Sequence, residues 1–218
     1  VSRCINSLLG WVGDITVEVV VLDNGSVDGT SEWLEQVSVR DSKIRVIHAD
    51  HVLGAGAANN VVLKQSRGQI VILLDTSMEI VGNIISPIKE LLADDSIGIV
   101  GPFGLRGMDL NHFHEVENGS GEMDAMQAYC LAFKRNRLRE VGVMREGFRF
   151  YRNLDLDFSF HFRDKGYQIV ACPFLPVRRH EHRIWNNIGE REREELSRKN
   201  YGRFLGKWGG RTDLLVSK

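Results

Sequence analysis

Short apolar runs alternate with helix-like stretches through the first half of the chain, and this alternation limits the fold more than any other feature. Each run is rich in β-branched residues, which favour strands, and a segment with helical periodicity follows it. Strands separated by helices usually lie parallel, because the crossover helix returns the chain to the same edge of the sheet. We therefore expect an α/β domain with strands at residues 17–22, 44–49, 69–74 and 97–100, and helices at residues 31–37, 55–65 and 84–93.

Length and charge exclude several functional classes. A chain of 218 residues suits one medium domain with a substantial core. Because 28 Lys and Arg residues face 29 Asp and Glu residues, no global field exists to hold nucleic acid or an anionic bilayer. The three cysteines are widely spaced in apolar surroundings, no apolar run could cross a bilayer, and the first residues lack the order of a signal peptide. We expect a cytoplasmic protein that binds no nucleic acid.

The second half of the chain is less regular. Residues 102–124 are rich in glycine and polar residues and predict a long loop. We expect His112 and His114 to be solvated there; the alternative is that they bind a metal or the acceptor. Beyond this segment we expect a strand at residues 126–133, a short helix at 137–141, a strand at 167–171 and a charged helical tail from residue 190.

The segment VVVLDNGSVDGT places short polar side chains, Asp23, Asn24 and Ser26, where an apolar strand ends and a helix follows. Open α/β sheets bind ligands at this edge. Asp23 can offer an acceptor, and Asn24 an amide, to the polar edges of a nucleotide base or ribose. The alternative interpretation is an ordinary turn, in which Asp28 only caps the next helix.

This segment resembles the DDGSTDGT or DNGSTDGT signature of family 2 glycosyltransferases, and three later segments match that family in the same order. They are VLGAGAANNVVLKQSRGQIVILLD, LREVGVMREGFRFYRNLDLDFSFHFRDKGYQ and RRHEH. The resemblance covers nearly the whole chain and implies the nucleotide-diphospho-sugar transferase (GT-A) fold, which has three α/β/α layers and a mixed, mainly parallel central sheet. It also places Asn60 among the nucleotide-binding residues. The opening CINSLLGW resembles the helix after the family's first strand, so we expect that strand to be missing.

The resemblance also implies a divalent cation. The family's Asp-x-Asp element usually holds Mg²⁺ or Mn²⁺ on the donor diphosphate, and it reads Asp75-Thr76-Ser77 here. One carboxylate suffices when phosphates and water supply the other ligands, so we expect Asp75 to bind both the donor and the metal. His180, ahead of His182, matches the family's late histidine and is the expected second ligand. The alternatives are a turn-capping Asp75 and a surface histidine, with diphosphate bound instead by arginines 178, 179 and 183.

The candidate catalytic base also comes from the resemblance. The family's Glu-Asp-x-Asp element aligns with Leu154 to Asp157, which makes Asp155 the expected base and Asp157 an acceptor-side residue, while His161 replaces the family's Arg. The alternation in NLDLDFSFHF by itself predicts a strand, whereas the resemblance implies a helix, which we follow because Gly166 suits a helix end. The remaining alternative is that Asp155 and Asp157 are solvated acids with no catalytic role.

The tail forms the second part of a two-part organisation, with a catalytic domain at residues 1–183 and an amphipathic helical tail at 184–218. Aromatic and apolar residues recur at helical spacing among basic residues. We expect this stripe to pack on the catalytic domain or on another subunit. A contact with the membrane surface, at the inner face of the membrane, is the alternative.

These observations favour an inverting glycosyltransferase that moves a sugar from a UDP-, GDP- or dTDP-sugar to a hydroxyl of a saccharide or lipid-linked acceptor. A non-catalytic protein that binds a nucleotide-sugar or a polysaccharide is the second hypothesis, because the metal and base motifs are both altered. A nucleotidyltransferase is the third, since those enzymes use a similar sheet.

Overall fold

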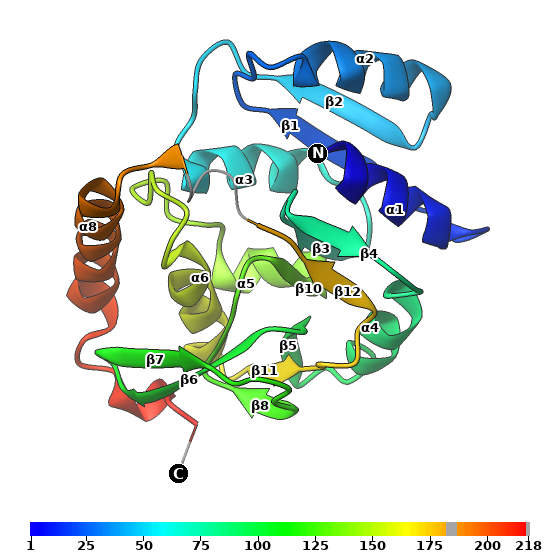
Figure 1. The fold of residues 1–218 in the computed structure, drawn as a ribbon. Helices are drawn as coiled ribbons and strands as arrows, with labels where there is room; N and C mark the ends of the chain where they lie inside the picture. The colour runs from blue at the N-terminus through cyan, green and yellow to red at the C-terminus, as the bar shows by residue number, and fades with distance from the viewer. Residues whose placement is uncertain (182–186, 217–218) are drawn as a thin grey trace.

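The computed structural model of the chain describes residues 1–181 and 187–216. A mixed sheet at its centre contains β3 (Ile70–Leu74), β5 (Ile97–Gly101), β8 (Gly121–Met123), β10 (Cys130–Lys134) and β11 (Gln168–Ala171). The strands lie in the order β3-β10-β5-β11-β8 (Figure 1). Strands β3, β5 and β11 point the same way, because β10 is antiparallel to both β3 and β5, while β11 is parallel to β5; β8 is antiparallel to β11.

A smaller layer lies above this sheet in Figure 1. It consists of β1 (Val19–Asp23), β2 (Ile44–His48) and α2 (Thr30–Arg40), and its two strands are parallel and in register from Val19↔Ile44 to Asp23↔His48. Buried Leu34 of α2 packs with Ile44 of β2. We call this unit the open layer, because the side of β1 that faces away from β2 pairs with no strand of the described ranges.

Two helices lie on opposite sides of β3. Leu8 of α1 (Ser2–Val12) packs in the apolar cluster that contains Ile72, whereas Leu63 of α3 (Ala55–Gln65) packs in the cluster that contains Leu73. Because successive side chains of a strand point to opposite faces, α1 and α3 cover different faces of β3. Helix α4 (Ile85–Leu91) lies in the same cluster as Leu8.

Residues 102–124 form strands, so the predicted long loop is wrong. Strand β6 (Gly104–Asp109) pairs antiparallel with β7 (His112–Glu115) and with β9 (Ala125–Met126), and residues 121–123 form the edge strand β8. The hairpin satisfies its backbone through pairing and packs Leu105 and Phe113 against the core. These strands are too short for their alternation to stand out between the glycines.

The single strand expected at residues 126–133 is divided between two sheets, as β9 and β10. Between them the Gln127 N–H donates to the Phe103 carbonyl at 2.9 Å, and the Ala128 N–H donates to the Asp155 carboxylate at 3.1 Å. The backbone at residues 127–129 therefore belongs to neither sheet, and it turns toward Asp155.

Residues 154–163 form helix α6 (Leu154–Arg163), as the resemblance implied. The alternation of apolar residues is misleading because nearly the whole helix is buried, including the polar residues Asp157, Ser159 and His161. A buried helix needs no solvent face, so its polar positions can follow any period. Phe158 and Phe162 both meet Phe133 of β10 edge to face, with ring centroids 5.5 and 5.7 Å apart.

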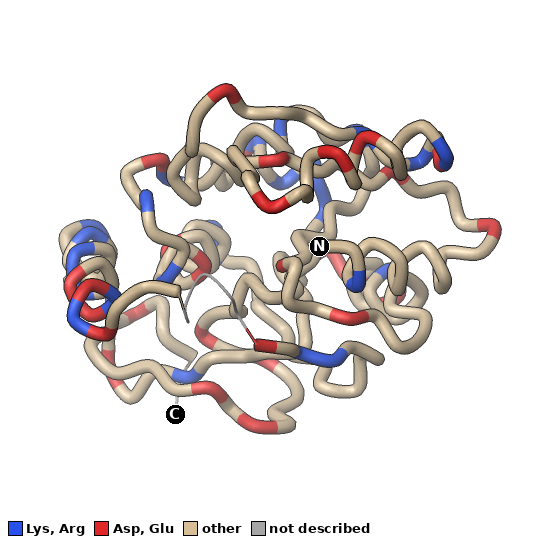
Figure 2. Tube along the Cα trace, turned by 45° about the horizontal axis from the view of Figure 1, so that its top comes forward, with Lys and Arg blue, Asp and Glu red and all other residues tan. Residues whose placement is uncertain are grey.

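The tail forms helix α8 (Glu190–Trp208) and a short 3₁₀ turn, η2 (Thr212–Leu214). Its apolar stripe packs on the domain, as expected: Phe204 and Trp208 are buried, and the Phe204 ring lies 4.9 Å from that of Phe160. Charges of both signs lie along the rest of this helix (Figure 2). Among helices of the described ranges, none is long and apolar enough to span a bilayer.

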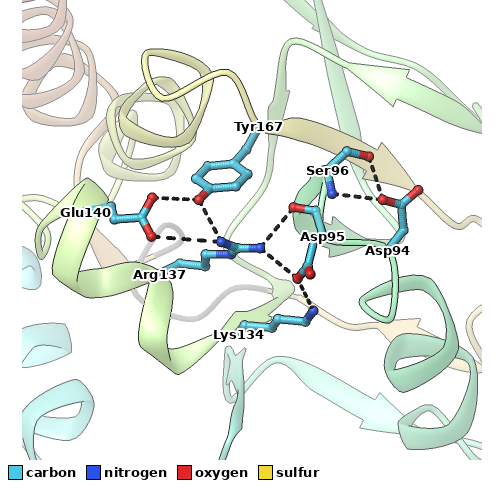
Figure 3. A network of polar contacts seen from close by, with 7 residues as sticks. All are labelled: Asp94, Asp95, Ser96, Lys134, Arg137, Glu140 and Tyr167. Atoms are coloured by element: carbon cyan, nitrogen blue, oxygen red, sulfur yellow. Dashed lines mark hydrogen bonds and ion pairs between the residues drawn. The ribbon is translucent and has the colours of Figure 1, made fainter.

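A polar network ties together the edge of the sheet at which β5 and β11 begin (Figure 3). Arg137 of η1 (Arg135–Arg137) donates to Asp95 at 2.9 Å and to the Tyr167 hydroxyl at 2.7 Å, and Tyr167 donates to Glu140 of α5 (Leu138–Val141) at 2.7 Å. Lys134, which belongs to this network, pairs with Ile70 at the start of β3, whereas Cys130 pairs with Leu74 at the end of β3. The carboxyl end of β3 therefore lies at the other end of the strands. This network therefore lies away from the ligand-binding edge.

The last strand pair forms a sheet of its own and places His180 beside the turn that follows β3. Strand β4 (Met78–Ile80) pairs antiparallel with β12 (Val177–Arg179), and Arg179 lies opposite Met78. Helix α1 holds this pair from the other side, because the Ile80 N–H donates to the Ser7 hydroxyl at 3.0 Å.

Candidate active site

A large cavity of about 2260 Å³ opens where β1 and β3 end and α6 begins. Such an edge is where open α/β sheets bind ligands. Five predicted site residues line it, namely Asn24, Ser26, Asp75, Asp155 and His180. The other three, Asp23, Asn60 and Asp157, lie outside its lining.

Asp23 shapes the turn after β1. Its buried carboxylate accepts hydrogen bonds from the Ser26 N–H at 3.0 Å and from the Ser31 hydroxyl, and it contacts His48 Nδ1 at 3.1 Å. Burial opposes ionisation, but these hydrogen bonds outweigh it and lower the pKa of Asp23 to about 2. The charged carboxylate therefore faces the protein and fixes the backbone of Asn24 and Ser26.

The Asn24 side chain binds the neighbouring loop. Its amide donates to the Leu53 carbonyl at 3.0 Å, and its oxygen accepts from the Leu53 N–H at 2.7 Å. Gly25 follows with a φ of 79°, and a Cβ there would lie 3.1 Å from Val52, so both conformation and space favour glycine. The two loops are thus joined at the rim of the cavity.

Asn60 is buried and joins α3 to the segment before α6. Its amide donates to the Met144 carbonyl at 2.8 Å and to Glu146 at 3.1 Å, while its oxygen accepts from the Met144 N–H at 3.0 Å. This position differs from the expected nucleotide contact, because every polar atom of the side chain bonds to the segment before α6. Asn60 holds α3 against that segment.

Asp75 directly follows β3 at the cavity, and its carboxylate accepts hydrogen bonds from the Ser77 N–H at 2.8 Å and from the Ser77 hydroxyl. Ser77 occupies the place of the second acid in the family motif. It therefore orients the remaining carboxylate instead of adding a second one.

His180 lies beside this turn because its N–H donates to the Ser77 carbonyl at 2.9 Å, in continuation of the β4–β12 pair. Its Nε2 atom is 2.7 Å from a Glu79 carboxylate oxygen, and the His180 hydrogen bond lowers the pKa of Glu79. The fold thus brings the predicted pair, Asp75 and His180, to one wall of the cavity.

The donor set fits a hard cation that is completed by its substrate. The Asp75 carboxylate suits Mn²⁺ or Mg²⁺, and phosphate oxygens and water usually supply the further ligands of these ions. Within residues 1–181 and 187–216, no group of three or more His, Cys, Asp or Glu side chains is placed to hold a metal ion. His182 and Arg183 lie outside the described residues.

Asp155 stands in the first turn of α6 and reaches the cavity. One carboxylate oxygen accepts from the Ala128 N–H at 3.1 Å and the other from the Leu156 N–H at 2.9 Å. Removal from water raises the pKa of Asp155, and these hydrogen bonds offset the effect only in part. A carboxylate in this environment accepts a proton more readily than an ordinary surface aspartate.

Asp157 faces the opposite way. It is fully buried, pairs with Arg145 through Nε at 2.9 Å, and accepts from Trp208 Nε1 at 2.9 Å. Burial opposes its ionisation, but hydrogen bonds from His161, Arg145 and Trp208 lower its pKa. Its position therefore differs from the acceptor-side expectation, since the carboxylate joins α6 to α8 and does not reach the cavity.

Tyr129 and Tyr151 line the cavity but were not singled out from the sequence. Burial is the main cause of the raised pKa of Tyr129; the charge of Arg179 lowers it, and the charges of Asp75 and Asp155 raise it further. Burial raises the pKa of Tyr151 to about 12, so both phenols stay protonated. The aromatic and basic run FRFYRN before α6 was the available signal for Tyr151.

The cavity wall also carries arginine. Arg179 lies over the rings of Phe103 and Tyr129, 5.0 and 4.9 Å from their centroids, and pairs with Glu115 at 3.1 Å. Arg152 lines the cavity beside Tyr151. A chain with little net charge thus places two guanidinium groups at the cavity, and Glu115 offsets the charge of one of them.

Known proteins resemble this chain over most of its length. An uncharacterized protein, y4gI, of Sinorhizobium fredii is 28% identical over 205 residues, which cover 81% of this chain and 22% of that protein. The structure of GalNAc-T7 with UDP, GalNAc and Mn²⁺ matches 97% of this chain and 46% of that one, with a TM-score of 0.77 and 17% identity. The Pyrobaculum calidifontis mannosyltransferase PcManGT with GDP-Man and Mn²⁺ matches 96% of this chain and 71% of that one, with a TM-score of 0.63 and 16% identity.

The structural neighbours show the fold, which is the GT-A fold that the sequence motifs implied. The chain spans only about a fifth of the length of the curated relative described above. The family model for glycosyl transferase family 2 matches residues 1–169, and these residues include the turn after β1, Asp75 and Asp155. The chain therefore belongs to glycosyl transferase family 2.

Proposed function

We propose that this chain transfers a sugar from a nucleoside-diphosphate donor to an acceptor hydroxyl, with inversion at the anomeric carbon. One observation carries the proposal: Asp155, whose pKa is raised, shares a cavity with Asp75 and His180 at the carboxyl ends of the strands. Proton acceptance and diphosphate binding need separate groups on one cavity, and these three residues supply them.

The proposed reaction is a direct displacement. The acceptor oxygen forms a bond to the anomeric carbon, the bond from that carbon to the phosphate oxygen breaks, and the nucleoside diphosphate leaves with the electron pair. Asp155 takes the proton of the acceptor hydroxyl as the new bond forms. The hydrogen bonds from Ala128 and Leu156 hold the carboxylate in place, so little rearrangement is needed in the transition state.

The nucleotide is proposed to lie over the turn after β1. Ser26 lines the cavity, whereas the side chains of Asp23 and Asn24 fix the turn from behind. We assign the direct contacts to Ser26 and to the backbone of Asn24, and positioning roles to Asp23 and Asn60.

Mn²⁺ or Mg²⁺ is the proposed cofactor, held by Asp75 with His180 beside it. When bound, such an ion neutralises charge on the leaving diphosphate. Arg179 adds a fixed positive charge on the same wall, held by two aromatic rings. The Mn²⁺ in both structural neighbours supports metal use.

The donor is proposed to be a UDP-, GDP- or dTDP-sugar, and the acceptor a saccharide or a lipid-linked saccharide. The neighbours named above hold UDP and GDP-Man, which supports this class of donor without selecting a base. We do not include Asp157 on the acceptor side, because its carboxylate binds Arg145 and Trp208. We also leave out a membrane contact through α8, because Phe204 and Trp208 of its apolar stripe are buried.

A donor panel tests the proposal. The chain is incubated with UDP-, GDP- and dTDP-sugars, with and without Mn²⁺, and with saccharide acceptors. We expect release of the nucleoside diphosphate from one donor class, dependence on Mn²⁺, and a product of inverted anomeric configuration by NMR. Turnover should fall at low pH as Asp155 becomes protonated, through a pKa above the ordinary 3.8.

Two variants make the panel decisive. Asp75→Asn should lose turnover and the response to Mn²⁺. Asp164→Asn, at the end of α6 where it pairs with Arg211, should retain both. Saturable nucleotide binding without turnover would favour the non-catalytic binding protein, and release of pyrophosphate would favour a nucleotidyltransferase.

A further inference from the structure

His48 lies at the end of β2, between two carboxylates that come from different elements. In the register of the two parallel strands it lies opposite Asp23. Its Nδ1 atom is 3.1 Å from an Asp23 carboxylate oxygen, and its Nε2 atom is 2.5 Å from a Glu35 carboxylate oxygen in α2. Both ring nitrogens therefore face hydrogen-bond acceptors.

This arrangement selects the protonated form of the imidazole. A neutral imidazole carries one N–H and can donate to only one of the two carboxylates, whereas the imidazolium donates to both. Asp23 is ionised, since its pKa is lowered to about 2, so it only accepts. The Glu35 hydrogen bond is the largest cause of the raised pKa of His48, and the hydrogen bond to Asp23 raises it further. The fold thus keeps His48 protonated to a higher pH than an ordinary histidine.

The Asp23 carboxylate that His48 contacts also fixes the turn after β1. Its other oxygen accepts from the Ser26 N–H at 3.0 Å, and Ser26 lines the cavity. The Ser31 hydroxyl of α2 donates to the same Asp23 oxygen that His48 contacts. Ser31 and Glu35 lie about one helical turn apart, so one face of α2 contacts both Asp23 and its histidine.

The loop after β2 begins directly beyond His48 and is bound to the same turn. The Ala49 N–H donates to the Asp23 carbonyl at 2.9 Å, and Asn24 exchanges two hydrogen bonds with the backbone of Leu53. His48 lies outside the lining of the cavity, whereas Asn24 belongs to it. The imidazole can therefore influence a ligand in the cavity only through the turn.

Building on the function proposed above, in which the turn after β1 holds the nucleotide, we propose that His48 is a positioning residue whose protonated form favours donor binding. The imidazolium and the Ser31 hydroxyl hold the Asp23 carboxylate, which in turn fixes the N–H of Ser26. When the ring loses its proton, one of its two carboxylate contacts loses the shared hydrogen, and the turn is held less firmly. Because the His48 side chain is 40% exposed, water screens its charge and the effect on affinity is moderate.

The titratable groups around the His48 ring act in one direction. Among the described residues, Asp23 of β1 and Glu35 of α2 pair with the ring, and both favour the cation. In the loop that follows, Asp50 and His51 pair with each other at 2.5 Å. The pKa of His48 is raised, so the protonated form and its contribution are complete below the ordinary value of 6.5. Donor affinity should therefore fall as the pH rises through the raised pKa of His48.

Donor affinity across pH tests the proposal. UDP-glucose, GDP-mannose and dTDP-glucose are titrated by calorimetry at fixed Mg²⁺ between about pH 5.5 and 8.5, because their diphosphate diesters do not titrate in this range. The wild type is compared with His48→Gln at each pH, so that protonation of Asp155 and His180 affects both proteins alike. We expect His48→Gln to bind the preferred donor about 3–10-fold more weakly at low pH, and this ratio should fall toward one as the pH rises.

Further measurements distinguish positioning from a general loss of structure. His48→Gln should raise the donor KM and leave kcat unchanged, because Asp155 is not altered. In the wild type, NMR titration of the His48 ring should show that donor binding raises the pKa of His48, by the logarithm of the same affinity ratio, since coupling is reciprocal. Glu35→Gln, which alters an exposed side chain, should lower that pKa and shift the fall in affinity to lower pH. His51→Gln is the matched control and should behave as the wild type.

The outcomes distinguish this inference from the function on which it rests. An affinity ratio between the wild type and His48→Gln that stays at one throughout the pH range would overturn the inference and leave the transferase proposal standing. The same holds for a His48 pKa that donor binding leaves unchanged, or for a His48→Gln variant that loses kcat and not affinity. If the wild type binds none of the three donors at any pH, the proposed function fails and the inference fails with it.

Discussion

The two halves of this molecule are built differently. In the closed half, which we define as α6, α8 and the central sheet, Phe158, Phe160 and Phe162 are fully buried, and the buried Asp157 carboxylate pairs with the half-buried side chain of Arg145. In the open layer, the four apolar residues of β1 are all only half-buried. The closed half is held by packing, whereas the open layer depends more on polar contacts around Asp23.

This difference explains where the candidate site lies. The proposed base, Asp155, belongs to the closed half, which can hold a carboxylate in fixed geometry. The proposed nucleotide turn belongs to the open layer, whose conformation follows from the Asp23 hydrogen bonds. Four predictions test this contrast, from the largest effect to the smallest.

Truncation of a buried side chain should show most clearly that the two halves differ in how much packing stabilises them. Phe160→Ala removes a fully buried ring that packs against Phe204 and Trp208, so we expect a loss of about 3–5 kcal/mol in the free energy of unfolding. Val20→Ala in the half-buried β1 strand should cost about 1 kcal/mol. Urea unfolding measures both values, and equal losses would contradict the contrast.

The buried carboxylate of Asp157 gives the next largest expected effect. Trp208→Phe removes the N–H that donates to the Asp157 carboxylate, and should cost about 1–3 kcal/mol because the acceptor stays buried and charged. Trp33→Phe in α2 is the matched control, since Trp33 is only partly buried against the open layer's cluster. A larger loss from the control would show that the Asp157 network is not a main support of the closed half.

Acid should weaken the open layer through Asp23. Its pKa is lowered from 3.8 to about 2, so the ionised carboxylate stabilises the fold above about pH 4, and this contribution disappears as the pH falls through 2. The shift corresponds to about 2 kcal/mol. The stability difference between the wild type and Asp23→Asn, measured in urea from pH 2 to 5, should shrink in that window. A constant difference would contradict the assigned role.

The surface network of Figure 3 should contribute least. Asp95 is mostly exposed although it pairs with Lys134 and Arg137, and exposed ion pairs contribute little because water and salt screen them. Asp95→Asn should leave Tm and turnover unchanged within error. A clear loss of turnover would mean that the edge of the sheet opposite the cavity influences the site.

Much of the fold could be predicted from the sequence. The runs at residues 19–23, 44–48 and 70–74 are strands, because consecutive β-branched residues are typical of strands that pack on both faces. The hairpin at residues 104–115 could not be predicted, because its strands are stabilised by long-range pairing and not by local pattern. Helix α6 needed the family resemblance, since a fully buried helix does not show a helical period of polar residues.

The site was predicted less completely than the fold. The motifs identified Asp75, Asp155 and His180, which line one cavity. They could not show that Asn60 and Asp157 turn away from it, because side-chain direction depends on partners such as Met144 and Arg145 that lie elsewhere in the chain. Sequence spacing therefore predicted carboxylates that line the cavity, but not what each carboxylate contacts.

The central claim assigns opposite roles to two aspartates that are two residues apart, and sugar-transfer rates of Asp155→Asn and Asp157→Asn test it most directly. Each rate is measured well below the Tm of its variant. We expect Asp155→Asn to lower the rate by about 10²–10⁴-fold with little change in Tm or nucleotide affinity. Asp157→Asn should instead lower Tm and keep most of the rate, because Arg145 loses its partner. Undiminished transfer by Asp155→Asn would contradict the account.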